Sequence, residues 1–589
     1  MTAITLALCQ FRPTKGSVAA NLDRIEAAFG LASAAAVVPD VLIFPEGMAT
    51  GYFLEGGVHE HAMTADALYA ELEARHRRSG APPLEICLGF YELFEDRLHN
   101  SAIWVALGGT DAGIRHVHRK VFLPTYGVFD EERFVEAGRE VRAFDTRFGR
   151  AAILVCEDAW HSLTATIAAL DGAQLIAVPA ASPARGLVPD PRHPGLPTSL
   201  VRWDRVVESI GSEHGVFVAL SQLVGFEGGK GFPGGSIVVN PAGDVIARAP
   251  LFEDAMLPVT IDLDEVARVR ASAPSLADLA VKLPHLVANL EDLGRTVERE
   301  QPRSGRAPAS GSAPPVAAPD LRIDTALTTR WLVEFIRDEV TRRRAFKRVL
   351  VGLSGGVDSA LAAWLAVAAL GKENVIGVRM PYRTSSHESL DHARCVTRAL
   401  GIDERTVDIT AAVDAYAAAS GVPMTPARLG NVMARLRMVT LFDLAAALDA
   451  IPLGTGNKSE RLLGYFTWHA DDAPPVNPLG DLFKTQIREL ARAVGVPAAI
   501  LDKPPTADLV AGQTDEGDIG IGYDRTDPIL EMLLRGHRED AILTAGFTRS
   551  EVELVRKRLD GTHWKRRLPS VAMVSQTAIG EYYLRPLDY

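Results

Sequence analysis

The sequence predicts an α/β protein made of two domains with different architectures, and three observations lead to this prediction. At 589 residues the chain is longer than one hydrophobic core usually serves. A segment at about Glu298–Asp320 is rich in Pro, Ser and Ala and shows no apolar periodicity, which is typical of a linker. The spacing of apolar runs also changes across this segment. We therefore expect a first domain in residues 1–265, a connector and linker in 266–324, and a second domain in 325–589.

The first domain is dense in short apolar runs of strand length. They are "AITLALC", "DVLIFPE", "LEICLGFYE", "NSAIWVAL", "RAAILVCE", "AQLIAVPA", "VFVALSQ" and "GSIVVNPAG". Helical stretches are expected only at about Ala19–Val37, Met63–Arg78 and Leu200–Glu213. Tightly spaced strands with few helices predict a layered α/β domain with two sheets.

In the second domain strands and helices alternate. The expected strands are Arg348–Leu353, Asn374–Val378 and Arg405–Ile409, and the expected helices are Gly356–Leu370, His387–Leu400 and Ala427–Leu448. This alternation predicts a doubly wound parallel sheet. Its binding crevice is expected at the carboxyl ends of the strands.

Composition limits the classes of function. With 47% hydrophobic and 23% charged residues, the chain is an ordinary globular protein. A net charge of −12 argues against sequence-independent binding to nucleic acid, which needs a basic surface. The start, "MTAITLALCQFRP", has no basic leader and is interpreted as a strand, and the longest apolar run is too short to span a bilayer. We therefore expect a cytoplasmic protein that binds neither nucleic acid nor membranes.

The cysteines Cys9, Cys87, Cys156 and Cys395 lie far apart and show no paired spacing. This distribution predicts reduced thiols rather than disulfides or a zinc site. Cys9, Cys87 and Cys395 are interpreted as small core residues.

The run "LSGGVDS" follows an apolar strand and opens a helix, as a phosphate-binding loop does. Gly355 and Gly356 let backbone amides turn toward an anion, and the helix adds its positive end. Ser354 and Ser359 supply hydroxyl donors, and Asp358 suits a Mg²⁺ ion that arrives with ATP. The loop lacks a lysine for the terminal phosphate, so it is better suited to hold the β- and γ-phosphates as leaving pyrophosphate. The reaction would then occur at the α-phosphate and give an acyl-adenylate.

"LSGGVDS" resembles the signature of the ATP pyrophosphatases that amidate carboxylates. Together with "LGTGNKSERLLGYFT", "NPLGDLFKTQIRELA", "KPPTADL" and "GQTDEGDIGIGYD", it resembles the NAD synthetases over most of residues 325–570. The resemblance implies an adenine nucleotide alpha hydrolase-like fold. It also implies a reaction in which ammonia attacks an adenylated nicotinate carboxylate, giving NAD, AMP and pyrophosphate.

The resemblance also assigns residues. It places Mg²⁺ on Asp358 and Glu460, and Lys484 supplies the cation that the loop lacks. The residues that would contact ATP are Ser354, Gly355, Gly356, Asp358, Ser359, Thr455, Lys484 and Thr506. Those assigned to the dinucleotide substrate, deamido-NAD, are Arg435, Trp468 and Lys565.

The sequence departs from the family pattern on the side of the carboxylate substrate. Trp468 stands where the family usually has a lysine, Pro475 where it has an aspartate, and Trp564 where a histidine is common. Two interpretations of Trp468 stay open: stacking on a nicotinate or adenine ring, and plain packing. Asp471 or Asp472 is a hypothetical replacement for the lost carboxylate.

The first domain contains a candidate nucleophile in "AAILVCEDAWHS". Cys156 ends an apolar strand and precedes Glu157 and Asp158, whose charges would raise the pKa of the thiol, so it needs a base and a nearby cation. "LIFPEGMATGY" places Glu46 just past a strand, and "HRKVFLPTYG" places Lys120 at the end of another.

A Glu, a Lys and a Cys in this order, each at a strand end, resemble the nitrilase superfamily, and in particular the glutamine-amidotransferase domains attached to NAD synthetases. The similarity covers about residues 1–265. It implies an α-β-β-α sandwich in which Glu46 is the general base, Lys120 stabilises the oxyanion and Cys156 forms a γ-glutamyl thioester. The residues that it assigns to glutamine or its channel are Tyr52, Glu157, Ser182 and Arg185.

The favoured hypothesis is a two-site enzyme. Glutamine is hydrolysed at Cys156, ammonia passes internally, and deamido-NAD is adenylated by ATP and amidated. A second hypothesis keeps this chemistry but uses nicotinate mononucleotide or another carboxylate. A third is an amidase whose C-terminal half only senses a nucleotide. The resemblance further implies small-molecule substrates and an even-numbered homo-oligomer, a dimer or larger.

Overall fold

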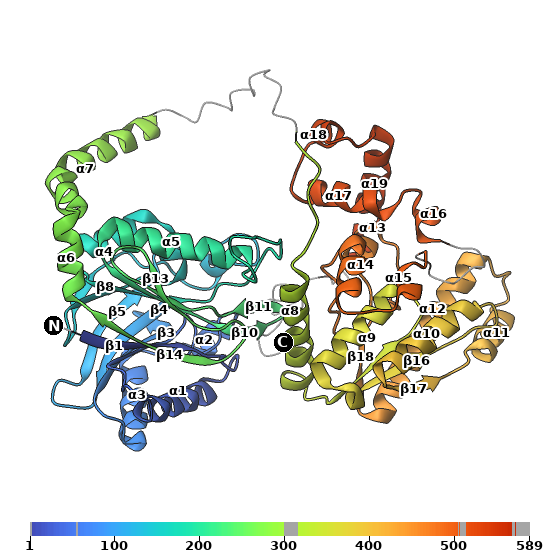
Figure 1. Cartoon of the computed structure of the whole chain (residues 1–589), viewed down its shortest axis with the longest axis horizontal. Coiled ribbons are helices and arrows are strands. Elements are labelled where there is room, and N and C mark those ends of the chain that lie inside the picture. Colours follow the sequence, from blue (N-terminus) through green and yellow to red (C-terminus); the bar gives the residue numbers. More distant parts are fainter. Residues whose placement is uncertain are drawn as a thin grey trace. The chain divides into compact units, whose positions relative to one another are not determined.

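The computed structural model describes residues 3–54, 57–299, 316–504, 506, 514–567 and 572. It divides into two compact units (Figure 1). One unit holds most of the described chain before residue 300, and the other holds most of the chain after residue 315. The domain limits expected from the sequence stay a prediction.

The described part of the first unit contains two six-stranded sheets and one hairpin. The first sheet has the order β14 (Ala255–Asp262), β1 (Ala3–Gln10), β2 (Val41–Ile43), β3 (Leu84–Phe94), β4 (Arg97–Leu107), β5 (Gly113–Arg119). The second has the order β13 (Val245–Arg248), β12 (Ile237–Val239), β9 (Phe217–Gln222), β8 (Leu175–Ala180), β7 (Arg150–Ile153), β6 (Ala143–Asp145). The hairpin pairs β10 (Val224–Glu227) with β11 (Lys230–Pro233).

The two sheets pack face to face between layers of helices, as the nitrilase resemblance implies. One core cluster takes Ile4, Leu6 and Leu8 from β1 together with residues of β7, β8 and β9. The alternate β1 residues, including Ala7 and Cys9, join a second cluster with α1 (Val18–Ser33) and α3 (Ala65–Ser79). Because successive side chains of a strand point to opposite faces, β1 is buried on both sides, and its middle residues from Leu6 to Cys9 are all apolar. On the other side of the sandwich lie α4 (Ser162–Leu170) and α5 (Thr198–His214).

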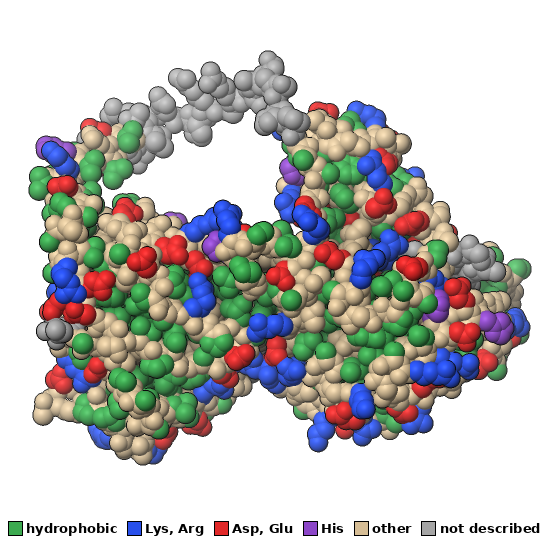
Figure 2. Space-filling model, viewed as in Figure 1, with side chains coloured by type: hydrophobic (Ala, Val, Ile, Leu, Met, Phe, Trp, Pro, Cys, Tyr) green, Lys and Arg blue, Asp and Glu red, His purple; other side chains and the backbone are tan. Residues whose placement is uncertain are grey.

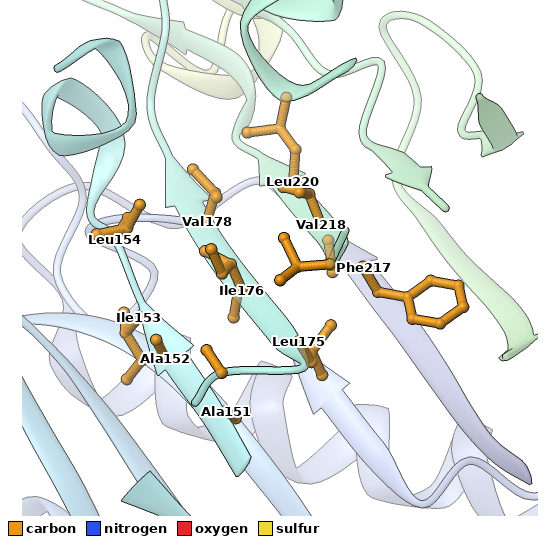
Figure 3. Close-up of a cluster of buried hydrophobic side chains, with 14 of the residues drawn as sticks. Ala151, Ala152, Ile153, Leu154, Leu175, Ile176, Val178, Phe217, Val218 and Leu220 are labelled. Carbon is orange, nitrogen blue, oxygen red and sulfur yellow. The ribbon is translucent and has the colours of Figure 1, made fainter. Parts of the chain in front are cut away.

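The inner core of the second sheet leads directly to Cys156. Figure 3 shows Ile153 and Leu154 at the end of β7, packed beside Ile176 and Val178 of the neighbouring parallel strand β8. Since Leu154 and Val155 are fully buried, the position of the next residue is tightly determined.

The described second unit contains a parallel sheet, as predicted, but one of its four strands, β18 (Ala450–Leu453), was not expected. Its order is β17 (Asp403–Thr406), β16 (Val375–Arg379), β15 (Arg348–Gly352), β18. The helices before or beside the sheet are α8 (Thr325–Arg337), α9 (Val357–Leu370), α10 (His387–Leu400), α11 (Thr410–Ala419) and α12 (Pro426–Leu448). Those that follow are α13 (Lys458–Leu463), α14 (Lys484–Ala493), α15 (Ala498–Leu501), α16 (Asp515–Ile519), α17 (Tyr523–Leu534), α18 (Glu539–Thr544) and α19 (Arg549–Gly561).

Three expectations about elements are wrong. The strand expected at Arg405–Ile409 begins earlier, at Asp403, and Ile409 instead packs with Val413 of α11. The apolar Val407 and Ile409 misled the prediction, because the exposed edge strand β17 is itself polar. Helix α4 was not expected, because its β-branched residues Thr164, Thr166 and Ile167 favour a strand over a helix. Helix α11 was not expected either.

Two further expectations need correction. Cys395 is exposed rather than in a core, because it lies off the face of α10 that buries Ala393 and Val396. Helices α6 (Asp264–Ser272) and α7 (Ser275–Arg299) occupy the connector, so the first two residues of the expected linker are helical. Residues 300–315 of that linker lie outside the described residues.

The surface carries charged side chains of both signs. On the face drawn in Figure 2, Lys and Arg are interspersed with Asp and Glu, and no extended basic stripe is seen there. Among the described residues, no helix has the length and hydropathy needed to cross a bilayer.

Candidate functional site

The three residues expected to act on glutamine meet in the first unit. Glu46 follows β2, Lys120 follows β5 and Cys156 follows β7, so each stands just beyond the carboxyl end of its strand. Glu46 and Lys120 are 0% exposed and Cys156 is 5% exposed. The ammonium nitrogen Nζ of Lys120 lies 2.7 Å from Oε1 of Glu46. The structure therefore brings Glu46 and Lys120 into contact, and Cys156 lies near enough for both charges to shift the pKa of its thiol.

A second carboxylate, Glu131, completes this cluster. Its Oε1 accepts a hydrogen bond from Lys120 Nζ at 2.7 Å and another from the Tyr52 hydroxyl. Asn100 Nδ2 donates to Glu46 at 2.8 Å and lies 3.4 Å from Glu131. Sequence reasoning missed Glu131, because it lies in the acidic run "FDEERF" with no apolar strand before it to single it out.

The electrostatics keep the resting thiol protonated. Burial raises the pKa of Cys156 well above its ordinary value, and the Glu46 carboxylate raises it further, while Lys120 lowers it. Burial also raises the pKa of Glu46, against the effect of Lys120. Burial alone would lower the pKa of Lys120, but Glu131 and Glu46 together raise it well above its ordinary value. The arrangement is thus a neutral thiol beside a carboxylate base and a fixed cation.

Asp158 fastens the nucleophile segment to the lysine segment. Its Oδ1 accepts hydrogen bonds from the amides of Val121 and Phe122, both at 2.9 Å, and its Oδ2 accepts one from Val155 N at 3.1 Å. Cys156 has a φ of +46°, a backbone conformation that is costly for a side chain of this type and that this packing holds in place. Asp158 is therefore a structural tie, and the carboxylates that raise the pKa of the thiol are Glu46 and Glu131.

The candidate glutamine-binding residues Glu157, Ser182 and Arg185 make the following contacts. Glu157 accepts a hydrogen bond from the hydroxyl of exposed Tyr126 at 2.8 Å. The guanidinium of Arg185 lies against Gly127, the residue after Tyr126. A Cβ placed on Gly127 would be 3.1 Å from Arg185 Nη1. Half-buried Ser182 follows Ala181, whose amide donates to Glu46 at 2.9 Å. Tyr126 was missed by sequence reasoning, and the binding roles stay predictions.

A cavity of about 230 Å³ lies beside Tyr52 and Glu131. Aromatic side chains form much of its wall, namely Phe53, Tyr91, Phe129 and Phe134. The site therefore has an apolar space next to its buried charges.

The second unit holds the phosphate-loop site. Gly355 has a φ of +78°, and a Cβ on it would lie 2.3 Å from the carbonyl oxygen of Ser389, so only glycine fits there. Ser354 Oγ and Ser359 Oγ lie 3.2 Å apart at the start of α9. The loop lines a cavity of about 280 Å³, which Thr455 and Thr506 also line.

Lys484, from a motif more than a hundred residues away, supplies the cation expected at this loop. Its Nζ lies 2.6 Å from Asp358 and 3.2 Å from Glu460. Asn457 donates to Asp358 at 2.8 Å and caps α13, which carries Glu460. The pKa of Glu460 is raised to about 7, chiefly by burial and also by Asp358, while Lys484 opposes the shift. Two carboxylates that already share one cation in a cavity fit the oxygen ligands that Mg²⁺ prefers.

Asp515 is a third carboxylate at this cavity that sequence reasoning did not single out. It is 4% exposed and lines the cavity with Asp358 and Glu460. Its Oδ1 is buried without a hydrogen-bond partner in the described part of the chain. Burial raises the pKa of Asp515. Asp515 lies in the run "GQTDEGD", which has three acidic residues, and the sequence does not show which of them faces the cavity.

Among the described residues, the candidates for the dinucleotide substrate do not themselves line the cavity, although Lys565 contacts Phe466, which does. Arg435 donates to the carbonyl of Trp468 at 3.1 Å, and Lys565 donates to the carbonyls of Gly464 and Phe466, both at 2.8 Å. Trp468 meets Trp564 edge to face, with ring centroids 5.2 Å apart. These groups hold one loop together, and their role toward a substrate stays a prediction.

The two aspartates suggested as a replacement at Pro475 do reach the cavity. Asp471 and Asp472 both line it, and Asp471 accepts a hydrogen bond from the Thr467 amide at 2.7 Å. Burial raises the pKa of Asp471.

Comparison with known proteins matches the two halves of the chain to two different families. The carbon-nitrogen hydrolase family model matches residues 5–271, and the NAD synthase family model matches residues 328–569. A curated NH(3)-dependent NAD(+) synthetase of Chlorobaculum tepidum is 46% identical over 262 residues, which cover 44% of this chain and 94% of that protein.

Two whole-length relatives carry both halves. The solved glutamine-dependent NAD+ synthetase of Acinetobacter baumannii, in complex with adenosine diphosphate, shares the fold with a TM-score of 0.70 at 24% identity, over 99% of this chain and 97% of that one. A curated glutamine-dependent NAD(+) synthetase of Thermotoga maritima is 31% identical over 605 aligned positions, which cover 100% of this chain and 99% of that protein. With both halves matched in order over the whole length, this chain belongs to the family of the glutamine-dependent NAD(+) synthetases.

Proposed function

We propose that this protein hydrolyses glutamine at Cys156 and uses the ammonia, together with ATP, to convert deamido-NAD into NAD, AMP and pyrophosphate. The observation that carries the proposal is that one chain holds both a buried Glu–Lys–Cys cluster and a phosphate loop with its own lysine and carboxylates. The whole-length relative from Thermotoga maritima, whose name states glutamine dependence, supports it.

In the first half-reaction Glu46 accepts the proton of the Cys156 thiol, and the thiolate attacks the amide carbon of glutamine. Lys120 stabilises the oxyanion of the tetrahedral intermediate. The intermediate collapses to a thioester as ammonia leaves with the proton from Glu46. Water, deprotonated by Glu46, then hydrolyses the thioester to glutamate and restores the thiol.

In the second half-reaction a carboxylate oxygen of deamido-NAD attacks the α-phosphorus of ATP, and pyrophosphate leaves. The amides and hydroxyls of the phosphate loop, together with Lys484, hold the departing phosphates. Ammonia then attacks the acyl carbon, and AMP leaves as NAD forms. Asp358 and Glu460 would hold Mg²⁺, which neutralises phosphate charge when bound.

Deamido-NAD is favoured over nicotinate mononucleotide or another carboxylate as the acceptor, because the curated relatives of the second half and of the whole chain are named for NAD(+). A C-terminal half that only senses a nucleotide is disfavoured, because Asp358, Glu460 and Lys484 form a complete charge cluster. An even-numbered homo-oligomer and a cytoplasmic location stay predictions from the sequence.

The test is a product assay by mass spectrometry. Purified protein is incubated with ATP, Mg²⁺, glutamine and deamido-NAD, with parallel reactions in which ammonium replaces glutamine, nicotinate mononucleotide replaces deamido-NAD, or the acceptor is omitted. NAD and AMP formed in equal amounts support the proposal. Glutamate formed without NAD would contradict the assigned acceptor, and an absence of glutamate would contradict the role of Cys156.

A further inference from the structure

Glu227 is a buried carboxylate for which the proposed chemistry has no direct use. It ends β10 and is 3% exposed. Its Oε2 accepts a hydrogen bond from the amide of Phe53 at 2.8 Å, and the Tyr52 amide lies 3.1 and 3.2 Å from Oε1 and Oε2. A carboxylate removed from water needs such donors, so the amides and the charge hold one another in place.

Tyr52, one of the two residues that Glu227 holds, is fastened at three points. Its amide donates to Glu227, its carbonyl accepts a hydrogen bond from the Tyr91 hydroxyl at 2.6 Å, and its own hydroxyl donates to Glu131. Glu131 in turn accepts a hydrogen bond from Lys120 at 2.7 Å. A continuous chain of hydrogen bonds therefore runs from Glu227 to the cation of the thiol site.

Side chains of the hairpin β10–β11 also pack against Tyr52 and Phe53. Lys230, paired with Glu227 across the hairpin, lies with its Nζ 4.2 Å from the centre of the Phe53 ring. The ring of Phe232 lies 6.3 Å from that of Tyr52 and 5.9 Å from that of Phe53. Since Tyr52 and Phe53 also line the 230 Å³ cavity, the hairpin supports both the charge cluster and its apolar neighbour.

We propose that Glu227 is a positioning residue for glutamine hydrolysis, which sets the place of the Lys120 ammonium through Tyr52 and Glu131. The inference rests on the proposed reaction at Cys156. The oxyanion-stabilising group must sit within a fraction of an ångström of its best position, and Lys120 is located by Glu46 on one side and by Glu131 on the other. Without Glu227, the segment that carries Tyr52 loses one of its anchors, and we expect the Tyr52 hydroxyl to shift away from the Glu131 carboxylate that it orients.

The test compares Glu227→Ala, Glu227→Gln, Tyr52→Phe and the double variant Glu227→Ala/Tyr52→Phe, all in the full-length protein. Glu227→Gln keeps one acceptor oxygen with little change of shape, so it remains informative if the alanine variant folds poorly. The matched control is Glu85→Ala, which removes a fully buried carboxylate that accepts from Trp104 Nε1 at 2.7 Å. Glu85 lies at the amino end of β3, whereas Glu46 lies beyond the carboxyl end of the parallel β2, so the control is at the opposite edge of the sheet.

The readouts are kcat and KM for glutamine and the rate of NAD formation from ammonium. We expect Glu227→Ala to lower the kcat for glutamine about tenfold or more with KM changed less than about twofold, because the loss falls on the transition state. Glu227→Gln should recover most of this loss, and ammonium-driven synthesis should be unchanged. The double variant should be no more than about twofold slower than Tyr52→Phe alone, since both changes break one chain of contacts.

Two results would overturn the inference even if Glu227→Ala slows glutamine hydrolysis. One is a double variant whose kcat for glutamine falls by the full product of the two single-variant factors. The other is a fall in kcat for Glu85→Ala equal to that for Glu227→Ala, which would indicate a general effect of removing a buried carboxylate. If the unaltered protein forms no glutamate, the proposed function fails instead. If the unaltered protein hydrolyses glutamine and Glu227→Ala has the same kcat and KM, the positioning role is contradicted while the proposed function stands.

Discussion

Each unit buries one lysine between two carboxylates. Lys120 contacts Glu46 and Glu131, and Lys484 contacts Asp358 and Glu460. A buried ammonium is tolerable only with such partners, and each group of three carries a net negative charge when ionised. At the thiol, burial together with this charge keeps Cys156 protonated until Glu46 takes the proton, and at the phosphate loop the charge favours a further cation. The same buried arrangement therefore has two different chemical consequences.

Replacing Lys484 tests the cation at the phosphate loop. We expect Lys484→Gln to weaken ATP binding by about ten- to a hundredfold, because it removes a charged donor and leaves Asp358 and Glu460 to repel the phosphates. The measurement is isothermal titration calorimetry with ATP and Mg²⁺. The control is Lys458→Gln, since Lys458 also begins a helix but pairs with exposed Asp481. Equal weakening in both variants would contradict the assignment.

Two adjacent glycines of the loop make a matched pair. A Cβ on Gly355 would lie 2.3 Å from Ser389 O at a φ of +78°, whereas a Cβ on Gly356 would meet only Ser354 Oγ at 3.4 Å. We expect Gly355→Ala to destabilise the loop by about 2 kcal/mol or more and to abolish ATP binding, while Gly356→Ala keeps the fold. Thermal unfolding with and without ATP checks this. A Gly355→Ala variant that ATP still stabilises normally would show that the loop conformation is wrong.

At the scale of elements, strand ends and helix starts position the chemistry. Glu46, Lys120 and Cys156 each follow a strand, while Asp358 and Lys484 stand at the first turn of α9 and α14. The backbone at these places is determined by buried strands or by the first turn of a helix, which is why side chains from distant motifs meet reproducibly.

The cap of α19 gives a prediction about stability and pH. Glu551 closes a capping box with Thr548 and forms two hydrogen bonds of 2.8 Å with Arg525. The Arg525 side chain lowers the pKa of Glu551 to about 2 from 4.5. Because the folded pKa is depressed, this stabilisation is fully present above pH 4.5 and is lost as the pH falls toward 2.

We therefore expect Glu551→Gln to destabilise α19 by about 1 kcal/mol near neutral pH, with a difference that shrinks below pH 4.5. Amide hydrogen exchange of α19 at several pH values measures it. Exposed Glu553 on the same helix provides the control Glu553→Gln. A pH-independent difference would mean that the carboxylate charge is not involved.

At the scale of the whole molecule, two variants should separate the half-reactions. We expect Cys156→Ala to lose NAD synthesis from glutamine by about a thousandfold or more while it keeps synthesis from ammonium, because only the first half-reaction needs the thiol. Lys484→Gln should lose synthesis from both nitrogen sources. Rates of NAD formation with each source provide the measurement. If Cys156→Ala also fails with ammonium, the division of labour between the two units is wrong.

Much of the fold and part of the candidate sites could be predicted from local patterns. Buried strands such as Arg348–Gly352 and long helices such as Pro426–Leu448 were found because they carry long apolar or periodic runs. Glu46, Lys120, Cys156 and the phosphate loop were found because each adjoins such a strand. Polar β17, the short helix α4 and the exposed side of α10 that carries Cys395 were misjudged because their local pattern is weak or ambiguous.

The sequence by itself determined the α/β class and the two sheet architectures, and it singled out the candidate reacting residues, because buried strands and a phosphate loop each leave a short local pattern. Only the tertiary structure decided which charges meet. Glu131, Asp515 and Glu227 lie in runs without a distinctive pattern, yet folding brings them to Lys120, to the phosphate-loop cavity and to Tyr52. The physical reason is that the energy of a buried charge depends on its neighbours in space, and those neighbours come from segments far apart in the chain.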